Sequence, residues 1–314
     1  MSYKKIIIAG GTGFIGNFLK EYFRTKTEKI IILSRSEPKE EENVSYIQWD
    51  GKTPGDWIKH LEGAEILINL TGKSVNCRYT EKNKQEIIDS RVSSTRILGR
   101  AVKLLVHPPA VWFNAASATI YRHADDQPND EYNGEYHDDF SVQVCKLWEQ
   151  SFNEIKLSDT RKIILRIAIV LGEKDGVVAR FKNLTNFGMG GKQGNGDQYF
   201  SWIHEEDLAN SIEYLYHHSE SEGIYNCSAP NPVRNKELMQ VYRSLLKPFF
   251  AFPSPEWLLK IGAALIGTET ELLLKSRWVL PRRLTEEGYT FLYPKINEAL
   301  KNVLNKNLIQ DQVH

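Results

Sequence analysis

The chain has 314 residues, 41% of them hydrophobic and 25% charged, and this ordinary globular composition excludes wholesale disorder. Its 40 basic residues balance 40 acidic ones, which argues against recruitment of nucleic acid or of an anionic membrane by bulk charge. The three cysteines are widely spaced, so the sequence predicts neither a disulfide framework nor a metal site and favours a reducing, cytoplasmic compartment.

Short β-branched runs alternate with longer amphipathic stretches through the first half of the chain. Several runs are continuously apolar, which is typical of parallel strands covered on both faces. Strands that alternate with helices predict right-handed crossovers and a doubly wound α/β sheet. The predicted strands cover residues 5–9, 30–33, 44–49, 66–70, 110–115, 162–169 and 200–204, the predicted helices cover residues 13–25, 80–106, 140–156 and 206–217, and a charged, solvated loop covers residues 38–43.

The pattern loosens after Gly172. Residues 188–196 hold five glycines in nine positions, a composition that predicts a mobile loop. From residue 229 onward, prolines separate short helical stretches. We therefore predict a larger domain and a smaller, mostly helical lobe. The larger domain would comprise residues 1–171 and 198–228, and the smaller lobe residues 172–197 and 229–314.

A glycine-rich turn joins the first predicted strand to the first predicted helix, with Gly10, Gly13 and Gly16 in a GxxGxxG spacing. The first glycine permits the sharp turn, the second lets the backbone approach a pyrophosphate, and the third allows tight packing of helix on strand. The helix N-terminus adds N–H donors and a partial positive charge. Its position at the first strand–helix junction predicts a dinucleotide site, and a purely structural turn is the alternative.

The end of the second predicted strand bears on which nicotinamide cofactor is bound. NAD sites usually place an acidic residue there, which accepts from the ribose 2′-hydroxyl. This chain has Ser34, Arg35 and Ser36 instead. A guanidinium can clamp a 2′-phosphate and hydroxyls add donors, so the sequence favours NADP(H) over NAD(H). The alternative is that Arg35 is a solvated surface residue.

Five blocks spread from end to end carry a resemblance to a known superfamily. They are GGTGFIG (10–16), NLTGKSVNCRYTEKNKQEIIDSRVSST (69–95), FSWIHEEDL (200–208), APNPVRNKEL (229–238) and VLPRRLTEEGYTFLYP (279–294). Because these blocks span the chain, the whole chain resembles the extended short-chain dehydrogenase/reductase superfamily, which contains the nucleotide-sugar epimerases. It resembles more closely an atypical branch of "epimerase family" proteins. The resemblance implies a Rossmann-type sheet with a smaller C-terminal lobe that binds the substrate.

Carried over residue by residue, the resemblance implies a set of cofactor contacts. Asp50 could accept from the adenine amino group, and an ordinary loop aspartate is the alternative. Arg91 stands where ordinary members have an asparagine, and it would form a salt bridge with Glu86 near the cofactor or a plain pair on the helix surface. The implied cofactor-binding residues are Gly10, Gly13, Phe14, Ile15, Gly16, Ser34, Arg35, Asp50, Leu70, Thr71, Gly72, Glu86 and Arg91.

The superfamily's chemistry implies a tyrosine acid/base, a lysine four residues later, and a serine or threonine that polarises the substrate oxygen. The stretch 117–121 resembles the serine strand, so Ser117 would keep its role and Lys146 would bind the cofactor ribose. Val142, four residues before Lys146 and so on the same helix face, stands where the tyrosine is expected and can carry no proton. Tyr121 is the nearest alternative acid, or else a structural aromatic. The other candidates are Lys146 itself, Tyr132 and His204.

Two functions follow from these residues. The leading one is an NADP-dependent oxidoreductase or epimerase that acts on a small polar metabolite or a nucleotide-sugar-like substrate. Arg166 could face a phosphate or carboxylate of that substrate, under a roof formed by residues 188–196, Tyr199 and Trp202. The alternative is a catalytically silent NADP(H)-binding sensor or scaffold, which the missing tyrosine favours. The expected partner is a small molecule, not nucleic acid, and no apolar run approaches the roughly 18 residues of a membrane span.

Overall fold

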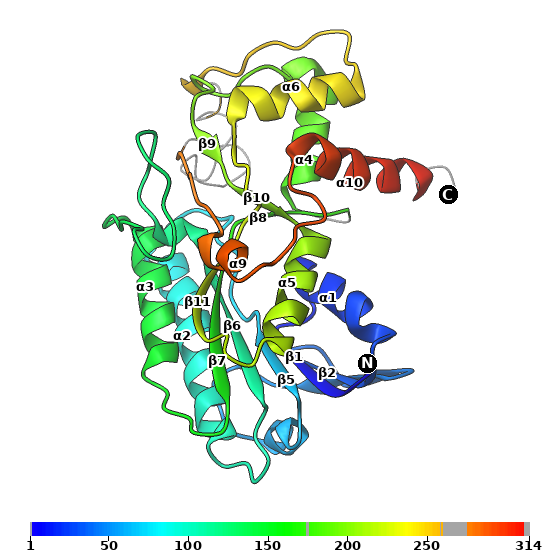
Figure 1. Cartoon of the computed structure of the whole chain (residues 1–314), viewed down its shortest axis with the longest axis vertical. Coiled ribbons are helices and arrows are strands. Elements are labelled where there is room, and N and C mark those ends of the chain that lie inside the picture. The colour runs from blue at the N-terminus through cyan, green and yellow to red at the C-terminus, as the bar shows by residue number, and fades with distance from the viewer. Residues whose placement is uncertain (1, 174–175, 258, 260–274, 311–314) are drawn as a thin grey trace.

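The computed structural model describes residues 2–173, 176–257, 259 and 275–310, and its largest feature is an eight-stranded sheet between helices (Figure 1). The strand order is β11-β7-β6-β5-β1-β2-β4-β3, and every neighbouring pair is parallel except β3 with β4. From β1 the chain first adds β2 and β4 on one side and then β5, β6, β7 and β11 on the other. This reversal of direction at β1 confirms the predicted doubly wound α/β fold. The strands are β1 (Tyr3–Ala9), β2 (Thr27–Ser34), β3 (Lys39–Glu41), β4 (Val44–Gln48), β5 (Ile66–Asn69), β6 (Val111–Ser117), β7 (Arg161–Ile167) and β11 (Gly223–Cys227).

Helices cover both faces of this sheet. Helices α1 (Phe14–Arg24) and α5 (Glu205–His217) pack on one face, and α2 (Glu81–Val102) and α3 (Phe140–Asn153) pack on the other (Figure 1). On β1, Ile6 and Ile8 join the core beneath α1 and α5, whereas Ile7 and Ala9 join the core beneath α2 and α3. All four are fully buried. Burial on both faces explains why the run is continuously apolar.

A smaller group of elements lies beyond the carboxyl ends of the sheet strands (Figure 1). Their side chains form a separate core that includes Phe181, Trp202, Met239 and Leu300. Two strand pairs belong here, β8 (Ile169–Leu171) with β10 (Trp202–His204) and β9 (Tyr199–Phe200) with β12 (Val233–Arg234). The helices are α4 (Val177–Leu184), α6 (Asn235–Leu246) and α10 (Ile296–Gln310), whereas α9 (Arg282–Glu286) returns to lie against β11.

Two predicted loops form backbone hydrogen bonds with neighbouring segments. Part of the segment 38–43 forms β3, an antiparallel edge strand on β4. Its Lys39 Nζ lies 2.6 Å from Glu41 Oε1 and 4.3 Å from the centre of the Tyr46 ring. Charged side chains are common on an edge strand, because its outer edge faces solvent. The glycine-rich segment 188–196 is held in place by backbone hydrogen bonds. The Gly191 amide donates to the Phe252 carbonyl oxygen at 3.0 Å, and the Gly194 amide donates to that of Ser254 at 2.9 Å.

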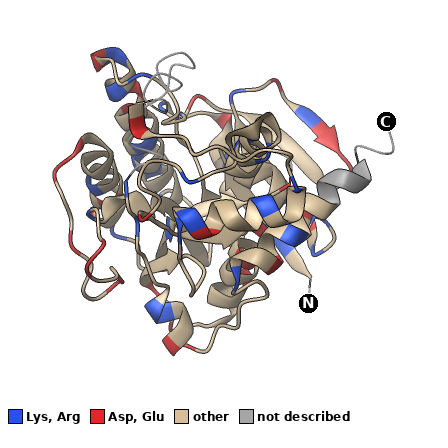
Figure 2. Cartoon of the chain, turned by 90° about the horizontal axis from the view of Figure 1, so that it is seen from above, with Lys and Arg blue, Asp and Glu red and all other residues tan. Residues whose placement is uncertain are grey.

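Charges of both signs are interspersed over the chain, as Figure 2 shows, in keeping with the zero formal net charge. Within the described residues, no helix combines the length and the apolar character that a membrane crossing requires. The longest, α2, has 22 residues and carries charged side chains along its length.

Candidate functional site

The glycine turn between β1 and α1 has the local geometry that its sequence predicts. Gly10 has a φ of +73°, and a Cβ there would lie 2.9 Å from the Thr71 backbone, so only glycine fits. A Cβ on Gly16 would lie 2.5 Å from Gly11 Cα, which shows how closely α1 packs on the turn. At Gly13, by contrast, the nearest atom to an added Cβ is the Gly10 carbonyl oxygen at 4.0 Å. The space beside Gly13 is therefore open.

That open space belongs to a cavity of about 770 Å³, which we call the glycine-turn cavity. It lies at the carboxyl ends of β1, β2, β4 and β5, where doubly wound sheets bind ligands. Its volume is within the usual range for cofactor sites, and its cradle of backbone beside Gly10 and Gly13 fits a pyrophosphate. The lining residues are Gly10, Thr12, Gly13, Ser34, Arg35, Trp49, Asp50, Gly51, Lys52, Leu70, Thr71, Gly72, Lys73, Ser74, Glu86, Asp89 and Ser90.

The structure brings nine of the sequence-predicted cofactor residues to this cavity, namely Gly10, Gly13, Ser34, Arg35, Asp50, Leu70, Thr71, Gly72 and Glu86. Four predicted residues do not line it. Phe14 and Ile15 pack against the core, Gly16 packs on the turn, and Arg91 lies behind the cavity wall. Lys52 and Lys73 line the cavity but were not predicted. The sequence gives no signal for Lys52, because it depends on the path of the loop after β4.

At one end of the cavity, Arg35 is exposed and the hydroxyl oxygen of Ser34 accepts from the Ser36 amide at 3.3 Å. Asp50 is an Asx-turn residue. Its carboxylate accepts from the amides of Lys52 and Thr53, each at 2.8 Å, and from the Thr53 hydroxyl at 2.7 Å. The hydrogen bond from the Thr53 amide is the main cause of a lowered pKa of Asp50, which is therefore ionised at neutral pH. A carboxylate with these partners can still accept a further donor at the cavity.

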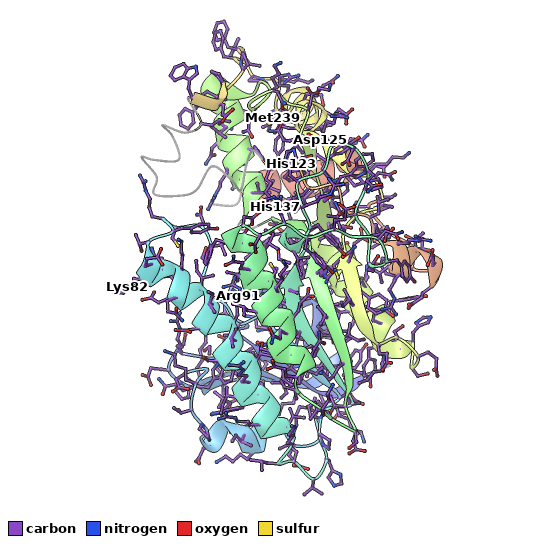
Figure 3. All side chains as sticks on the ribbon, turned by 90° about the vertical axis from the view of Figure 1, so that its left-hand side faces the viewer. Lys82, Arg91, His123, Asp125, His137 and Met239 are labelled. Atoms are coloured by element: carbon purple, nitrogen blue, oxygen red, sulfur yellow. The ribbon has the colours of Figure 1, made fainter. Side chains whose placement is uncertain are left out.

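The expected ion pair between Arg91 and Glu86 is wrong. Glu86 pairs with Lys73 instead, and that hydrogen bond lowers the pKa of Glu86. Arg91 lies where α2 and α3 run side by side (Figure 3). Its Nη1 donates to the carbonyl oxygens of Lys73 at 2.9 Å and Ile87 at 3.0 Å, and its guanidinium lies 5.1 Å from the ring centre of Trp148 in α3. A Cβ on Gly72 would lie 2.9 Å from Arg91 Cζ. Arg91 therefore supports the 71–73 backbone from behind, where burial lowers its pKa.

A second cavity, of about 570 Å³, begins at the carboxyl end of β6 and reaches into the smaller lobe; we call it the Ser117 cavity. The Ser117 hydroxyl oxygen accepts from the Thr119 amide at 3.2 Å, so its O–H remains available to donate to a ligand oxygen. The lining residues are Val75, Asn76, Ser117, Ala118, Thr119, Ile167, Ala168, Ile169, Val177, Arg180, Phe181, Asn183, Leu184, Gln198, Tyr199, Phe200, Ser201, Asn235, Lys275 and Arg277.

Lys146 lines neither of these two cavities. It lies on the exposed face of α3, where its Nζ donates to the His137 carbonyl oxygen at 3.2 Å and lies 5.9 Å from the centre of the Tyr136 ring. Val142 faces inward and is fully buried in a cluster with Tyr121 and Cys145. Val142 thus fills a packed core, and Lys146 lies on an exposed helix face outside both cavities.

Tyr121 is fully buried beneath the Ser117 cavity and does not line it. Its hydroxyl donates to Asn226 Oδ1 at 2.9 Å and accepts from Arg166 Nη1 at 2.8 Å. Burial raises the pKa of Tyr121 despite the nearby guanidinium. Arg166 is also buried, and it forms two 2.7 Å hydrogen bonds with the Glu149 carboxylate. Its expected role as a substrate ligand is wrong, since its charge is already paired inside the protein.

The remaining sequence candidates have structural partners. Tyr132 is exposed, and its hydroxyl donates to Glu286 Oε2 at 3.2 Å. His204 is fully buried at the start of α5, where its Nδ1 accepts from the Glu206 amide at 3.1 Å, and its ring stacks on Tyr293 at 3.9 Å. Trp202 is buried in the core of the smaller lobe, whereas Tyr199 does line the Ser117 cavity. Of the predicted active-site side chains, the structure thus brings Ser117 and Tyr199 to that cavity.

Comparison with known proteins gives one consistent group of relatives. Residues 6–228 match the family model described as "NAD dependent epimerase/dehydratase family", and residues 254–303 match a domain of unknown function, DUF1731. The epimerase family protein YfhF of Bacillus subtilis (strain 168) is 31% identical over 302 residues, which are 95% of this chain and 97% of that protein. The chloroplastic SDR39U1 homolog of Arabidopsis thaliana, also an epimerase family protein, is 31% identical over 96% of this chain and 87% of its own.

Among solved structures, the human epimerase family protein SDR39U1, crystallised with NADPH, superposes with a TM-score of 0.82 at 26% identity. The superposition covers 95% of this chain and 98% of the human one.

Proposed function

The chain belongs to the NAD dependent epimerase/dehydratase family and has its NAD(P)-binding Rossmann fold, and from that premise we propose that it is an NADP(H)-dependent oxidoreductase or epimerase. The observation that carries this proposal is the pair of cavities at the carboxyl edge of one sheet. The glycine-turn cavity would hold the dinucleotide, and the Ser117 cavity would hold a small-molecule substrate. We include a cytoplasmic location in the proposal, because all three cysteines are free thiols.

The choice of NADP(H) rests on the end of β2. Ser34 and Arg35 line the glycine-turn cavity there, and no hydrogen bond or ion pair within the described residues engages the Arg35 guanidinium. A 2′-phosphate would give this cation a charge-assisted, bidentate partner. NADH offers only a hydroxyl at the same place. The presence of NADPH in the human relative's crystal structure is in keeping with this choice.

We expect NADPH to bind at least about tenfold more tightly than NADH, a difference of roughly 1.4 kcal/mol. Arg35→Asp should erase or reverse that preference, because a carboxylate repels the 2′-phosphate and accepts from a 2′-hydroxyl. Isothermal titration calorimetry of parent and variant with both cofactors measures it. Arg100→Asp is the matched control, since Arg100 is exposed on α2 and lines neither cavity. Equal affinities for the two cofactors in the parent would contradict the assignment.

The bound cofactor would supply or accept a hydride at the nicotinamide. For its part, the chain would orient the substrate through Ser117, whose hydroxyl proton can be donated to the substrate oxygen. A side chain that exchanges protons must reach that oxygen, and Tyr121 lies outside the cavity with its hydroxyl already engaged on two sides. The proton is thus delivered by another group, within the cavity or from water.

This division of roles predicts different outcomes for two hydroxyl deletions. Ser117→Ala should lower turnover by about a hundredfold, within the usual range for a hydrogen-bonding group at the reacting atom. Tyr121→Phe should leave turnover within about twofold and instead lower the free energy of unfolding by about 1–3 kcal/mol, because Asn226 and Arg166 lose a buried partner. NADPH oxidation over a panel of carbonyl metabolites, with urea unfolding of each variant, measures both. Turnover that depends on the Tyr121 hydroxyl would contradict the assignment.

A second candidate function is a catalytically silent NADP(H)-binding sensor or scaffold. Two observations favour it. The position expected to carry the acid/base tyrosine is the buried Val142, and Lys146 lies on an exposed face of α3. This function would be supported if the protein binds NADPH tightly but oxidises it with none of the carbonyl metabolites tested.

A further inference from the structure

The Ser117 cavity combines an apolar wall with positive charge, and we propose that its ligand is an amphipathic anion. Such a ligand has an apolar body, a terminal carboxylate or phosphate, and a carbonyl or hydroxyl oxygen that reaches Ser117. This inference rests on the proposed function, because it names the substrate class of the same site. It narrows the sequence-based expectation of a small polar or nucleotide-sugar-like substrate.

One face of α4 supplies both chemistries. Val177, Arg180, Phe181 and Leu184 all line the cavity, and their spacing of i, i+3, i+4 and i+7 places them on a single helical face. Phe181 is fixed there, since its ring lies 6.1 Å from that of Phe200 and 5.5 Å from that of Tyr242. The helix therefore places three apolar residues and one solvent-exposed arginine along the wall of the cavity.

Among the described residues that line the cavity, none carries a charge opposite to that of Arg180. Its guanidinium forms no hydrogen bond or ion pair within the described part of the chain, and two further cationic residues, Lys275 and Arg277, line the same cavity. Lys275 pairs with Asp139, the residue that caps α3. None of the 20 lining residues is acidic. A cation beside an apolar surface gains most from a ligand that is itself an anion.

The rest of the wall fits the body of such a ligand. Ten of the lining residues are apolar or aromatic, among them Ile167 and Ile169 at the sheet edge beside Ser117. Contact with apolar groups at this wall removes apolar surface from water on both partners. A free sugar would place hydroxyl groups against these apolar side chains, where the hydroxyls find no hydrogen-bond partner. The donor at Ser117 and the cation at Arg180 therefore bracket an apolar surface.

The test uses the full chain saturated with NADPH and four probes, namely decanoate, decyl phosphate, decanol and UDP-glucose. The two anionic amphiphiles are used below their micelle-forming concentrations and decanol below its solubility limit. Calorimetry should show the two anionic amphiphiles binding at least about tenfold more tightly than decanol, as expected for one charge-assisted contact. The tighter of the two anions identifies the preferred head group. UDP-glucose should bind more weakly than both.

Substitutions then assign the site. Arg180→Ala should weaken decanoate binding by about tenfold, whereas Arg180→Lys should keep it within about threefold because the charge is retained. Lys182→Ala, which removes a charge from the same helix outside the cavity, should change it by less than about twofold. Decanoate binding that is insensitive to Arg180→Ala would overturn the inference, as would decanol binding as tightly as decanoate.

The same titrations separate the two proposals. Absence of NADPH binding, together with decanoate binding that depends on Arg180, would overturn the proposed cofactor and leave the inference about the cavity standing. NADPH binding without a preference for anionic amphiphiles would overturn the inference about the cavity and leave the proposed cofactor standing.

Discussion

Gly13→Val is expected to abolish nucleotide binding while leaving the fold intact. The position tolerates a side chain in the protein itself, because an added Cβ meets nothing closer than 4.0 Å. Its φ of −81° and ψ of 178° are extended backbone that valine adopts readily. The valine methyl groups would, however, occupy the space beside the turn where a pyrophosphate must approach the backbone. We expect NADPH affinity to fall by at least about a hundredfold, or roughly 2.7 kcal/mol.

Gly16→Val is the matched comparison within the same motif. A Cβ there would lie 2.5 Å from Gly11 Cα and 2.6 Å from its carbonyl carbon, both of them backbone atoms that cannot move aside. This variant should therefore lose stability, whereas Gly13→Val should unfold at the parental urea concentration. Calorimetric titration and urea unfolding of both variants distinguish the two effects. Parental NADPH affinity in a folded Gly13→Val protein would show that the phosphates bind elsewhere.

The glycine turn could be predicted because its constraints are local. Gly10, Gly13 and Gly16 lie within seven consecutive residues, so their spacing can be recognised without knowledge of distant neighbours such as Thr71. The continuous apolar runs indicated the parallel sheet for a similar reason, since burial on both faces leaves a mark on each strand separately. The predictions fail for segments whose structure depends on pairing at the edge of the sheet or on a distant partner. An example is β3, which pairs with β4 at the sheet edge.

The pairing of Glu86 could not be predicted from its helix. Arg91 lies five positions later, a spacing that does not bring two side chains onto one helical face. The partner that Glu86 binds, Lys73, comes from the loop after β5. Arg91 in turn stacks on Trp148, which belongs to α3. Both contacts form only when separate elements pack together, so no local pattern contains them.

The helical phase of α3 is visible in its sequence. Val142, Cys145, Trp148 and Phe152 form its buried stripe, and Lys146 falls between exposed positions. The resemblance predicts a tyrosine–lysine pair on one face of this helix, whereas the stripe includes Val142 and excludes Lys146. The cavity face of α4 also has a readable pattern, because Val177, Phe181 and Leu184 recur at helical spacing. The other two cations that line the same cavity, Lys275 and Arg277, come from a distant part of the chain, so no local pattern connects them to α4.

The buried pair Arg166–Glu149 carries the prediction with the largest effect on stability. Two hydrogen bonds of 2.7 Å join the guanidinium to the carboxylate, and the two side chains are only 2% and 8% exposed. Burial alone would lower the pKa of Arg166, but the hydrogen bonds and charge of Glu149 outweigh it and raise that pKa. The charges are thus stable only as a pair.

Glu149→Gln is therefore expected to lower the free energy of unfolding by about 3–5 kcal/mol, because it leaves the Arg166 charge buried without a counterion. The double variant Glu149→Leu with Arg166→Met should recover most of that loss, since no charge then remains in the interior. Asp197→Asn is the control, as it breaks the Lys236–Asp197 pair, whose atoms are 2.8 Å apart with both side chains about half exposed, and it should leave the urea midpoint unchanged. Urea unfolding of the four proteins measures these differences. If Glu149→Gln and Asp197→Asn unfold at the same urea concentration, the buried Arg166–Glu149 pair contributes no more to the free energy of unfolding than an exposed ion pair does.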